Sequence, residues 1–314
     1  MSAADVLTIG ETMVMVTPQP GGRLDARSTF LLRPGGAESN VAASLAMLGH
    51  SAAWASAVGA DPLGDLVVDT LRGHGVDVSL VRRDPRRPTA VYFKDPAPTG
   101  TSVYYYRTGS AASALSTGDL AAWAARHPRV THLTGITPAL SKPCHDLVRR
   151  LVHDRPLAPS LLSFDVNHRA ALWPDGGGDE LRALARASDV VFVGRDEAHT
   201  LWGTTTAESV RALLPEPPYL IVKDAEVEAV AFTPSGTYRE PSCRVEVVDA
   251  VGAGDAFAAG WLSGLLDGLD EPERLRLGHR LAARVLRSPS DLAGLSPADR
   301  KGVGSHVADG RPRA

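Results

Sequence analysis

The sequence VEVVDAVGAGDAFAAG at residues 245–260 constrains the fold more than any other stretch of the chain. Its β-branched start predicts a strand, and apolar residues recur at helical spacing from Ala256 onward. The amides of Gly252-Ala253-Gly254 would then lie at the N-terminus of a helix, where unpaired N–H groups attract anions. Asp255 would lie beside them as a carboxylate that the positive end of the helix keeps ionised. An anion site next to a base suits the transfer of a phosphoryl group to a hydroxyl.

Other interpretations of this stretch are less specific or fail on the residues. An ordinary helix start, with glycines in the turn and Asp255 as a cap, is an equal alternative for an isolated Gly-Ala-Gly-Asp. A dinucleotide-binding fingerprint needs a third small residue where Phe257 stands. A Walker phosphate loop needs Gly-Lys-Ser/Thr, and the sequence contains no such tripeptide.

Composition narrows the class of protein. With 314 residues, 44% hydrophobic and 22% charged, the chain resembles an ordinary globular protein. A net charge of −3 gives no reason to expect binding to nucleic acid or to an anionic membrane. Cys144 and Cys243 are the only cysteines, so neither a disulfide framework nor a zinc site is expected. No apolar run reaches membrane-spanning length and no signal peptide is recognisable, which predicts a cytoplasmic protein.

Strand-like and helix-like stretches alternate through the second half of the chain. Strands are predicted at 130–133, 161–166, 190–193 and 219–222, with helical stretches around 144–152, 180–187 and 195–213. This alternation predicts a mainly parallel sheet covered by helices on both faces. Ligands of such sheets bind beyond the carboxyl ends of the strands. The sequence places Gly35-Gly36, residues 167–169, Gly194 and residues 252–255 there.

Two segments, at about 12–34 and 88–108, have a different character. Both combine short strand-like runs with Pro- and Gly-rich turns, which predicts hairpins. Paired with each other, they would form a small separate sheet that acts as a lid. Residues 1–295 are therefore expected to form the main domain with this lid inserted, and residues 296–314 a flexible tail.

Three groups of residues are candidates for binding a polar ligand. Alternation in the run Tyr104-Tyr105-Tyr106-Arg107 places Tyr105 and Arg107 on one face of a strand. Arg169 follows the predicted strand that ends near Val166, and two guanidinium groups would suit a carboxylate. Gly35-Gly36 opens a helix whose first turn offers the Asn40 amide. A lid that packs on itself or on a partner subunit, an ion-paired Arg169 and a plain glycine turn are the corresponding structural alternatives.

At this point the chain resembles the ribokinase-like (PfkB) carbohydrate kinase family over residues 5–295. The Gly35-Gly36…Asn40 element is similar to the N-terminal signature of that family, and residues 249–257 are similar to its more specific C-terminal signature. The stretches at 105–111, 132–140 and 165–169 are most similar to 2-keto-3-deoxygluconate kinases.

This resemblance implies an α/β three-layer sandwich with a small β-sheet lid and ATP-dependent phosphorylation of the terminal hydroxyl of a keto-deoxy sugar acid. Asp255 would be the base, with Gly252, Ala253 and Gly254 holding the phosphoryl charge. The implied sugar-acid site comprises Gly35, Gly36, Asn40, Tyr92, Tyr105, Arg107, Ile136, Arg169 and Asp291. The implied nucleotide site comprises Asn167, Arg169, Gly194, Lys223, Ala225, Glu228, residues 252–254 and His279. Magnesium would arrive with ATP rather than in a protein cage.

The resemblance also implies a homodimer or higher oligomer formed through the lid, because lid edges can pair between subunits. It leaves open a monovalent cation near Val251 and the choice between gluconate and galactonate stereochemistry.

The predicted nucleotide side departs from the family pattern. Lys223-Asp224-Ala225-Glu226-Val227-Glu228 stands where a Lys-x-Gly-x-x-Gly turn is usual, so both glycines are missing and acidic residues are added. If the turn needs positive φ at Ala225 or Glu228, each side chain there costs about 1 kcal/mol or more. Gly194, His279 and Pro289 also replace more usual residues. A sugar-acid kinase with an altered nucleotide site is the favoured hypothesis. A fructokinase-like hexose kinase and a sugar-acid sensor that has lost efficient catalysis are the alternatives.

Overall fold

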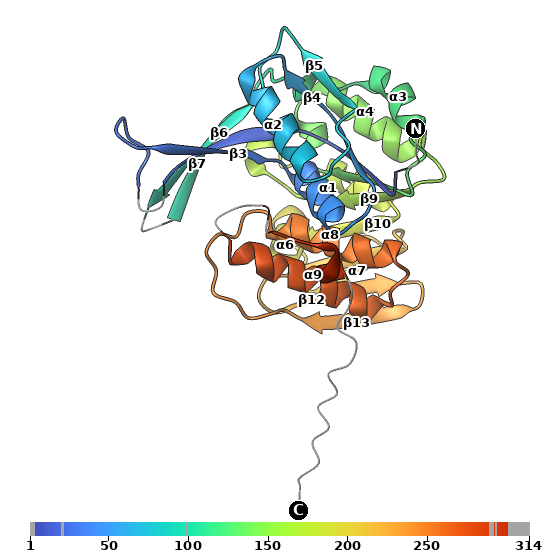
Figure 1. Ribbon diagram of the computed structural model, residues 1–314. Coiled ribbons are helices and arrows are strands. Elements are labelled where there is room, and N and C mark those ends of the chain that lie inside the picture. Colours follow the sequence, from blue (N-terminus) through green and yellow to red (C-terminus); the bar gives the residue numbers. More distant parts are fainter. Residues whose placement is uncertain (1–3, 20–21, 98–99, 289–291, 293, 301–314) are drawn as a thin grey trace, which may run out of the picture.

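The computed structural model describes residues 4–19, 22–97, 100–288, 292 and 294–300, which form two β-sheets with helices around the larger one (Figure 1). In these residues the larger sheet has nine strands in the order β13-β12-β11-β10-β9-β8-β1-β4-β5. The strands are β1 (Val6–Ile9), β4 (Ala52–Gly59), β5 (Val81–Asp84), β8 (Val130–Thr134), β9 (Leu161–Asp165), β10 (Val190–Gly194), β11 (Tyr219–Asp224), β12 (Glu228–Thr233) and β13 (Gly236–Pro241). Neighbours from β11 to β5 are parallel, and β12 and β13 add antiparallel strands at one edge.

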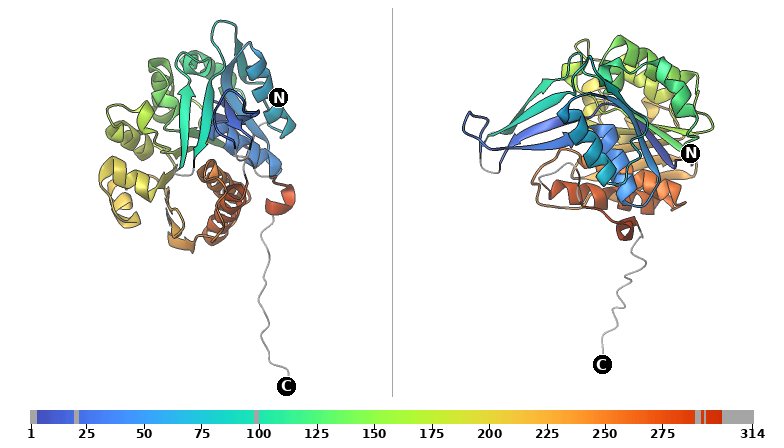
Figure 2. Two further views of the ribbon diagram at one scale, coloured as in Figure 1. Left: turned by 90° about the vertical axis from the view of Figure 1, so that its left-hand side faces the viewer. Right: turned by 45° about the horizontal axis from the view of Figure 1, so that its top comes forward.

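Helices cover both faces of this sheet (Figure 2). One face packs against α3 (Leu120–Ala124), α4 (Lys142–His153), α5 (Gly178–Arg186), α6 (Arg195–Trp202) and α7 (Ala207–Leu213). The other packs against α1 (Ala37–Met47), α2 (Pro62–Gly73), α8 (Ala253–Leu266) and α9 (Glu271–Leu286). Alternation along β1 explains the two layers, because Leu7 and Ile9 join the first core and Val6 joins the second. Within the described part of the chain, no helix is both long and apolar enough to cross a bilayer.

The two segments predicted to form hairpins build a second sheet, here called the lid sheet. Its described strands are β2 (Met13–Pro18), β3 (Phe30–Gly35), β6 (Val91–Ala97) and β7 (Gly100–Tyr106), in the order β3-β2-β6-β7. The pairing of β2 with β6 joins the two segments, and the sheet projects from the main body at the left of Figure 1. The predicted fold class, a three-layer α/β sandwich with a small lid, is confirmed.

The prediction of a strand at residues 245–248 is wrong. These residues form no ladder, and the side chains of Val247 and Val248 are 56% and 61% exposed. The segment pairs with no strand of the sheet, and the Val248 N–H instead donates to the Leu286 carbonyl of α9 at 2.7 Å. The helix after it begins at Ala253 rather than at Ala256.

The helical stretch predicted at 195–213 is divided. α6 ends at Gly203, which has a left-handed backbone, and α7 begins after Thr206, whose side chain caps the new helix by accepting from Ser209 N–H. The segment expected to be flexible from residue 296 also starts with structure. α10 (Pro297–Arg300) is attached by ion pairs from Asp299 to Arg284 and from Arg300 to Asp267. The packed chain therefore extends past residue 295, and residues 301–314 lie outside the described part.

Candidate active site

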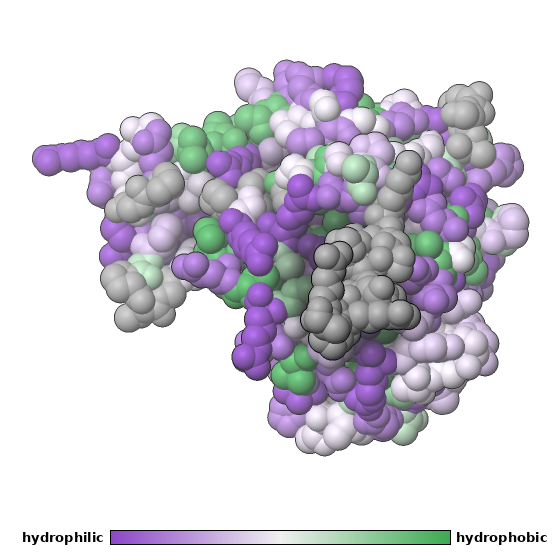
Figure 3. Space-filling view, turned by 60° about the horizontal axis from the view of Figure 1, so that its bottom comes forward, coloured by the Kyte–Doolittle hydropathy of each residue, from purple (hydrophilic) through white to green (hydrophobic). Residues whose placement is uncertain are grey.

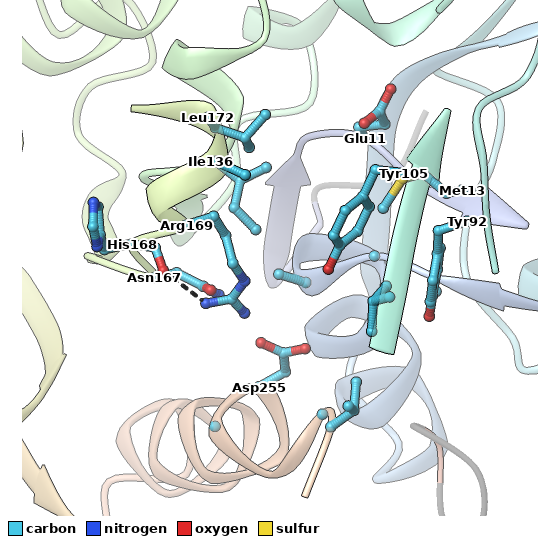
Figure 4. A pocket seen from close by; sticks show the side chains of 18 of the residues that line it. Glu11, Met13, Tyr92, Tyr105, Ile136, Asn167, His168, Arg169, Leu172 and Asp255 are labelled. Atoms are coloured by element: carbon cyan, nitrogen blue, oxygen red, sulfur yellow. Dashed lines mark hydrogen bonds between the residues drawn. The ribbon is translucent and has the colours of Figure 1, made fainter. Parts of the chain in front are cut away.

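A cleft of about 1140 Å³ lies between the lid sheet and the carboxyl ends of the parallel strands (Figure 4). Strands far apart in the sequence contribute to it, because the carboxyl ends of parallel strands meet at one edge of the sheet. The predicted site residues that line it are Gly35, Gly36, Asn40, Tyr92, Tyr105, Arg107, Ile136, Asn167, Arg169, Gly194, Lys223, Gly252, Gly254 and Asp255.

Asp255 lies in the first turn of α8 and faces this cleft. Its Oδ2 accepts a hydrogen bond from the Asn40 side-chain amide at 2.9 Å. Burial raises the pKa of Asp255 to about 7; the Asn40 hydrogen bond counteracts this rise and the nearby Asp165 carboxylate adds to it. Burial therefore makes this carboxyl a weaker acid than the ionised carboxylate expected from its place at the helix start.

The loop before α8 presents backbone amides to the cleft. Gly252 caps the helix with φ of 81°, a left-handed backbone that favours glycine. The first-turn amides of Gly254 and Asp255 have no acceptor within the helix, so they are available to an anion. The Ala253 N–H instead donates to the Ala250 carbonyl at 3.4 Å, and Ala253 does not line the cleft.

The two arginines predicted to bind a carboxylate differ in their surroundings. The Nε and Nη2 atoms of Arg107 lie 2.7 and 2.5 Å from Oε2 of the buried Glu11 carboxylate. The Ser110 hydroxyl donates to the other Glu11 oxygen. Arg169 is exposed, its Nη1 donates to the His168 carbonyl at 3.0 Å, and it takes part in no ion pair within the described chain. Arg169 is therefore better placed than Arg107 to meet the carboxylate of a ligand.

The lid sheet brings aromatic side chains to the cleft. Tyr92 and Tyr105 are cross-strand partners with ring centroids 5.7 Å apart, and the Arg107 guanidinium lies 5.8 Å from the Tyr105 ring. Tyr106 contacts Phe93 on the opposite face of the sheet, as alternation predicts. In Figure 4, Tyr105 lies across the cleft from Arg169, and Asp255 lies below both. Gly35 permits this packing, since a Cβ there would lie 2.4 Å from the Tyr92 hydroxyl.

A group of buried charges fixes the floor of the cleft. The Lys223 ammonium on β11 donates to Asp165 at the end of β9 at 2.8 Å. Burial alone would lower the pKa of Lys223, but attraction to Asp165 outweighs it and the pKa is raised. Glu197 on α6 accepts the N–H groups of Gly194 (3.0 Å) and His168, and burial together with Asp165 raises its pKa. These contacts connect the carboxyl ends of β9, β10 and β11.

Some of the predicted nucleotide residues lie elsewhere. Ala225, Glu228 and His279 do not line the cleft. Asp291, predicted for the sugar-acid site, and Pro289 lie outside the described residues. His279 on α9 instead forms a 3.1 Å hydrogen bond with the Glu240 carbonyl and contacts the edge of Phe257.

The β11–β12 turn has the backbone expected at one of its two positions. Ala225 has φ of 33°, whereas Glu228 has no positive φ and belongs to β12. The added acidity is partly neutralised, because Arg195 lies 3.0 Å from Asp224 and Arg239 lies 2.5 Å from Glu228.

Several lining residues were not among the predicted site residues, and Glu11, Lys94 and Glu197 are three charged examples. Glu11 follows β1, Lys94 lies on β6 and Glu197 lies on α6. Glu11 stands at a strand end and Lys94 shares a strand face with Tyr92 by period-two alternation, so both had a sequence signal. Across the described residues, no group of three or more His, Cys, Asp or Glu side chains is placed to hold a metal ion.

Comparison with known proteins places the chain among sugar kinases. Residues 3–298 match the model of the pfkB family of carbohydrate kinases. The chain is 37% identical over 304 residues to the 2-dehydro-3-deoxygluconokinase of Bacillus subtilis, covering 93% of this chain and 92% of the relative. It is 32% identical to the 2-dehydro-3-deoxygalactonokinase of Haloferax volcanii, with 94% of each chain covered. The crystal structure of a PfkB protein from Polaromonas sp. JS666 superposes with a TM-score of 0.85 at 33% identity, covering 95% of this chain and 99% of that one. The chain is therefore a phosphotransferase that belongs to the pfkB family of carbohydrate kinases.

Proposed function

We propose that this kinase transfers the terminal phosphoryl group of ATP to the terminal hydroxyl of 2-keto-3-deoxygluconate, the compound also called 2-dehydro-3-deoxygluconate. The observation that carries the proposal is that Asp255, whose pKa burial raises to about 7, and the Arg169 guanidinium, which forms no ion pair with the described residues, face one cleft. A sugar acid has both groups that this pair would recognise, a hydroxyl to be deprotonated and a carboxylate to be held. The relatives that act on keto-deoxy sugar acids support the same substrate class.

In the proposed reaction, Asp255 accepts the proton of the hydroxyl as that oxygen attacks the phosphoryl group. Asn40 holds the carboxyl in place through its 2.9 Å hydrogen bond. The free amides at the start of α8 bind the charge that develops on the transferring group. Mg²⁺ bound to the ATP phosphates would neutralise part of their charge.

The two alternatives are less well supported. A fructokinase-like enzyme would have no carboxylate for Arg169 to bind. A sensor without catalysis would not need a base with a pKa near neutrality, and the acidic turn that favoured a sensor is partly neutralised by Arg195 and Arg239.

The direct test is turnover by the purified protein with ATP and Mg²⁺. We expect phosphorylation of 2-keto-3-deoxygluconate or its galactonate epimer at least ten times more efficiently than of fructose, as a charge-assisted contact worth about 1.5–3 kcal/mol implies. Asp255→Asn should lower kcat about 10²–10⁴-fold. Equal or better turnover of fructose would exclude the sugar-acid assignment, and full activity of Asp255→Asn would exclude the base.

Three further expectations belong to this proposal. A cytoplasmic location and assembly through the lid sheet stay predictions. So does a monovalent cation near Val251, which a comparison of KCl with a bulky organic chloride at constant ionic strength would test.

A further inference from the structure

Lys94 connects the lid sheet to the loop that precedes α8. It lies on β6, two residues after Tyr92, and lines the cleft with its side chain only 7% exposed. Its ammonium lies 2.9 Å from Oδ2 of Asp249 and donates a hydrogen bond to it. The two residues are 155 positions apart in the chain, so this contact joins the sheet that holds the proposed sugar site to the loop that holds the phosphoryl site.

Asp249 is bound through both of its oxygens. Its Oδ1 accepts the Val251 N–H at 3.0 Å, which shapes the loop just before the left-handed Gly252. Its Oδ2 is the atom that meets Lys94. The same carboxylate therefore orders the anion-binding loop and anchors the lid sheet.

The charge of Asp249 is unfavourable for an anion site. A carboxylate beside the free amides of α8 would repel the phosphates of a nucleotide, and the cleft already contains Asp165 and Asp255. Lys223 and Arg169 supply positive charge to the cleft from β11 and from the loop after β9. Lys94 supplies positive charge at Asp249. Because its ammonium is almost fully shielded from water, it attracts that carboxylate strongly.

We propose that Lys94 is a positioning residue for the nucleotide, although it belongs to the sheet on the sugar side. It neutralises Asp249 and holds the loop at residues 249–252 against the lid sheet. The inference rests on the proposed kinase reaction for its meaning, but its test does not depend on turnover.

The experiment measures binding of the Mg²⁺ complex of a non-hydrolysable ATP analogue, and separately of 2-keto-3-deoxygluconate, by calorimetry. Lys94→Met should weaken binding of the analogue about tenfold or more, because Asp249, whose side chain is 30% exposed, would keep its charge beside the phosphate site without the ammonium. Lys94→Arg should weaken it much less. Binding of the sugar acid should change less than about threefold, a difference under 1 kcal/mol.

A second substitution separates electrostatics from packing. Asp249→Asn keeps an oxygen for the Val251 N–H but removes the charge, so the double variant Lys94→Met/Asp249→Asn should bind the analogue more tightly than Lys94→Met alone. A double variant that binds no better, or a Lys94→Met that weakens only the sugar acid, would overturn the proposal. A folded wild-type protein that does not bind the analogue would also overturn the proposal. Thermal unfolding of each variant controls for folding, and wild-type turnover tests the proposed function independently.

Discussion

At the scale of single residues, the proposed role of Asp255 as the base predicts that the reaction depends on pH. Burial raises its pKa to about 7, and only the deprotonated carboxylate can accept a proton. We expect kcat/KM to rise through an inflection near pH 7 and then to level off. Initial rates between pH 5 and 9 measure this. An inflection near pH 4, the ordinary range of an aspartate, would contradict it.

The same raised pKa predicts an effect on stability. A carboxyl whose folded pKa lies above its unfolded value costs no stability below about pH 4, and its cost grows until the pH passes the folded pKa of about 7. Asp255→Asn should therefore raise the Tm at pH 8 more than at pH 4.5, in scanning calorimetry at both pH values. Asp267 is a control of opposite sign, because its hydrogen bond with Arg300 lowers its pKa. Asp267→Asn should lower the Tm at pH 8.

Substitution of Arg169 tests whether Arg169 or Arg107 recognises the carboxylate of the sugar acid. Since Arg107 is already paired with Glu11, loss of Arg169 should remove most of the discrimination for a carboxylate. We expect Arg169→Ala to lower kcat/KM for the sugar acid about 30–100-fold, the loss of a charge-assisted contact of about 2–3 kcal/mol. Fructose turnover should fall by a smaller factor, because Arg169 also holds down the pKa of Asp255. Arg182→Ala, on the surface of α5, is the matched control. Equal losses for both substrates would contradict a role in recognising the carboxylate.

At the scale of elements, the β11–β12 turn carries strain that can be removed. Ala225 has φ of 33°, a conformation that costs a side chain about 1 kcal/mol relative to glycine. Ala225→Gly should therefore raise the free energy of unfolding by about 0.5–1 kcal/mol in urea titrations. Ala231→Gly, in the extended β12, should lower it. A loss of stability in Ala225→Gly would show that the turn is not strained.

The elements that the sequence predicted best are those with a strong local pattern. α1 begins directly after the Gly35-Gly36 pair, as predicted, and Asp61 caps the start of α2. The apolar runs of β8 to β11 identified the parallel sheet. Residues 245–248 show the limit of such patterns: β-branched residues favour a strand, but a strand forms only beside a partner, and here the Val248 N–H bonds to the Leu286 carbonyl of α9 instead.

Prediction of the site was limited for a similar reason. The two signature stretches identified the cleft, since each contains its own turn and helix start. The partners Glu11–Arg107 and Lys94–Asp249 are separated by 96 and 155 residues, so no local pattern connects them. The pKa of Asp255 depends on burial by the whole cleft rather than on the helix to which it belongs.

At the scale of the whole molecule, one face of the lid sheet is covered by α2 only near Val14 and leaves large apolar side chains exposed. The face opposite Tyr92 and Tyr105 carries Leu32 and Tyr106, which are 46% and 65% exposed. Figure 3 shows hydrophobic side chains (green) on the left-hand part of the molecule, the side to which the lid sheet projects. β3 and β7 are also edge strands of this sheet, and edge strands can pair with another chain.

These features predict that two copies of the chain assemble through their lid sheets. A symmetric dimer would cover the apolar face of both sheets at once, because the same patch meets itself across a two-fold axis. We expect sedimentation equilibrium to give a dimer for the wild type and a monomer for Leu32→Glu/Tyr106→Glu, since introduced charges would face each other across the contact. Val227→Glu, at an exposed valine of the β11–β12 turn, should leave the dimer intact. A monomeric wild type would contradict the prediction, and a dimer that survives the double substitution would place the interface elsewhere.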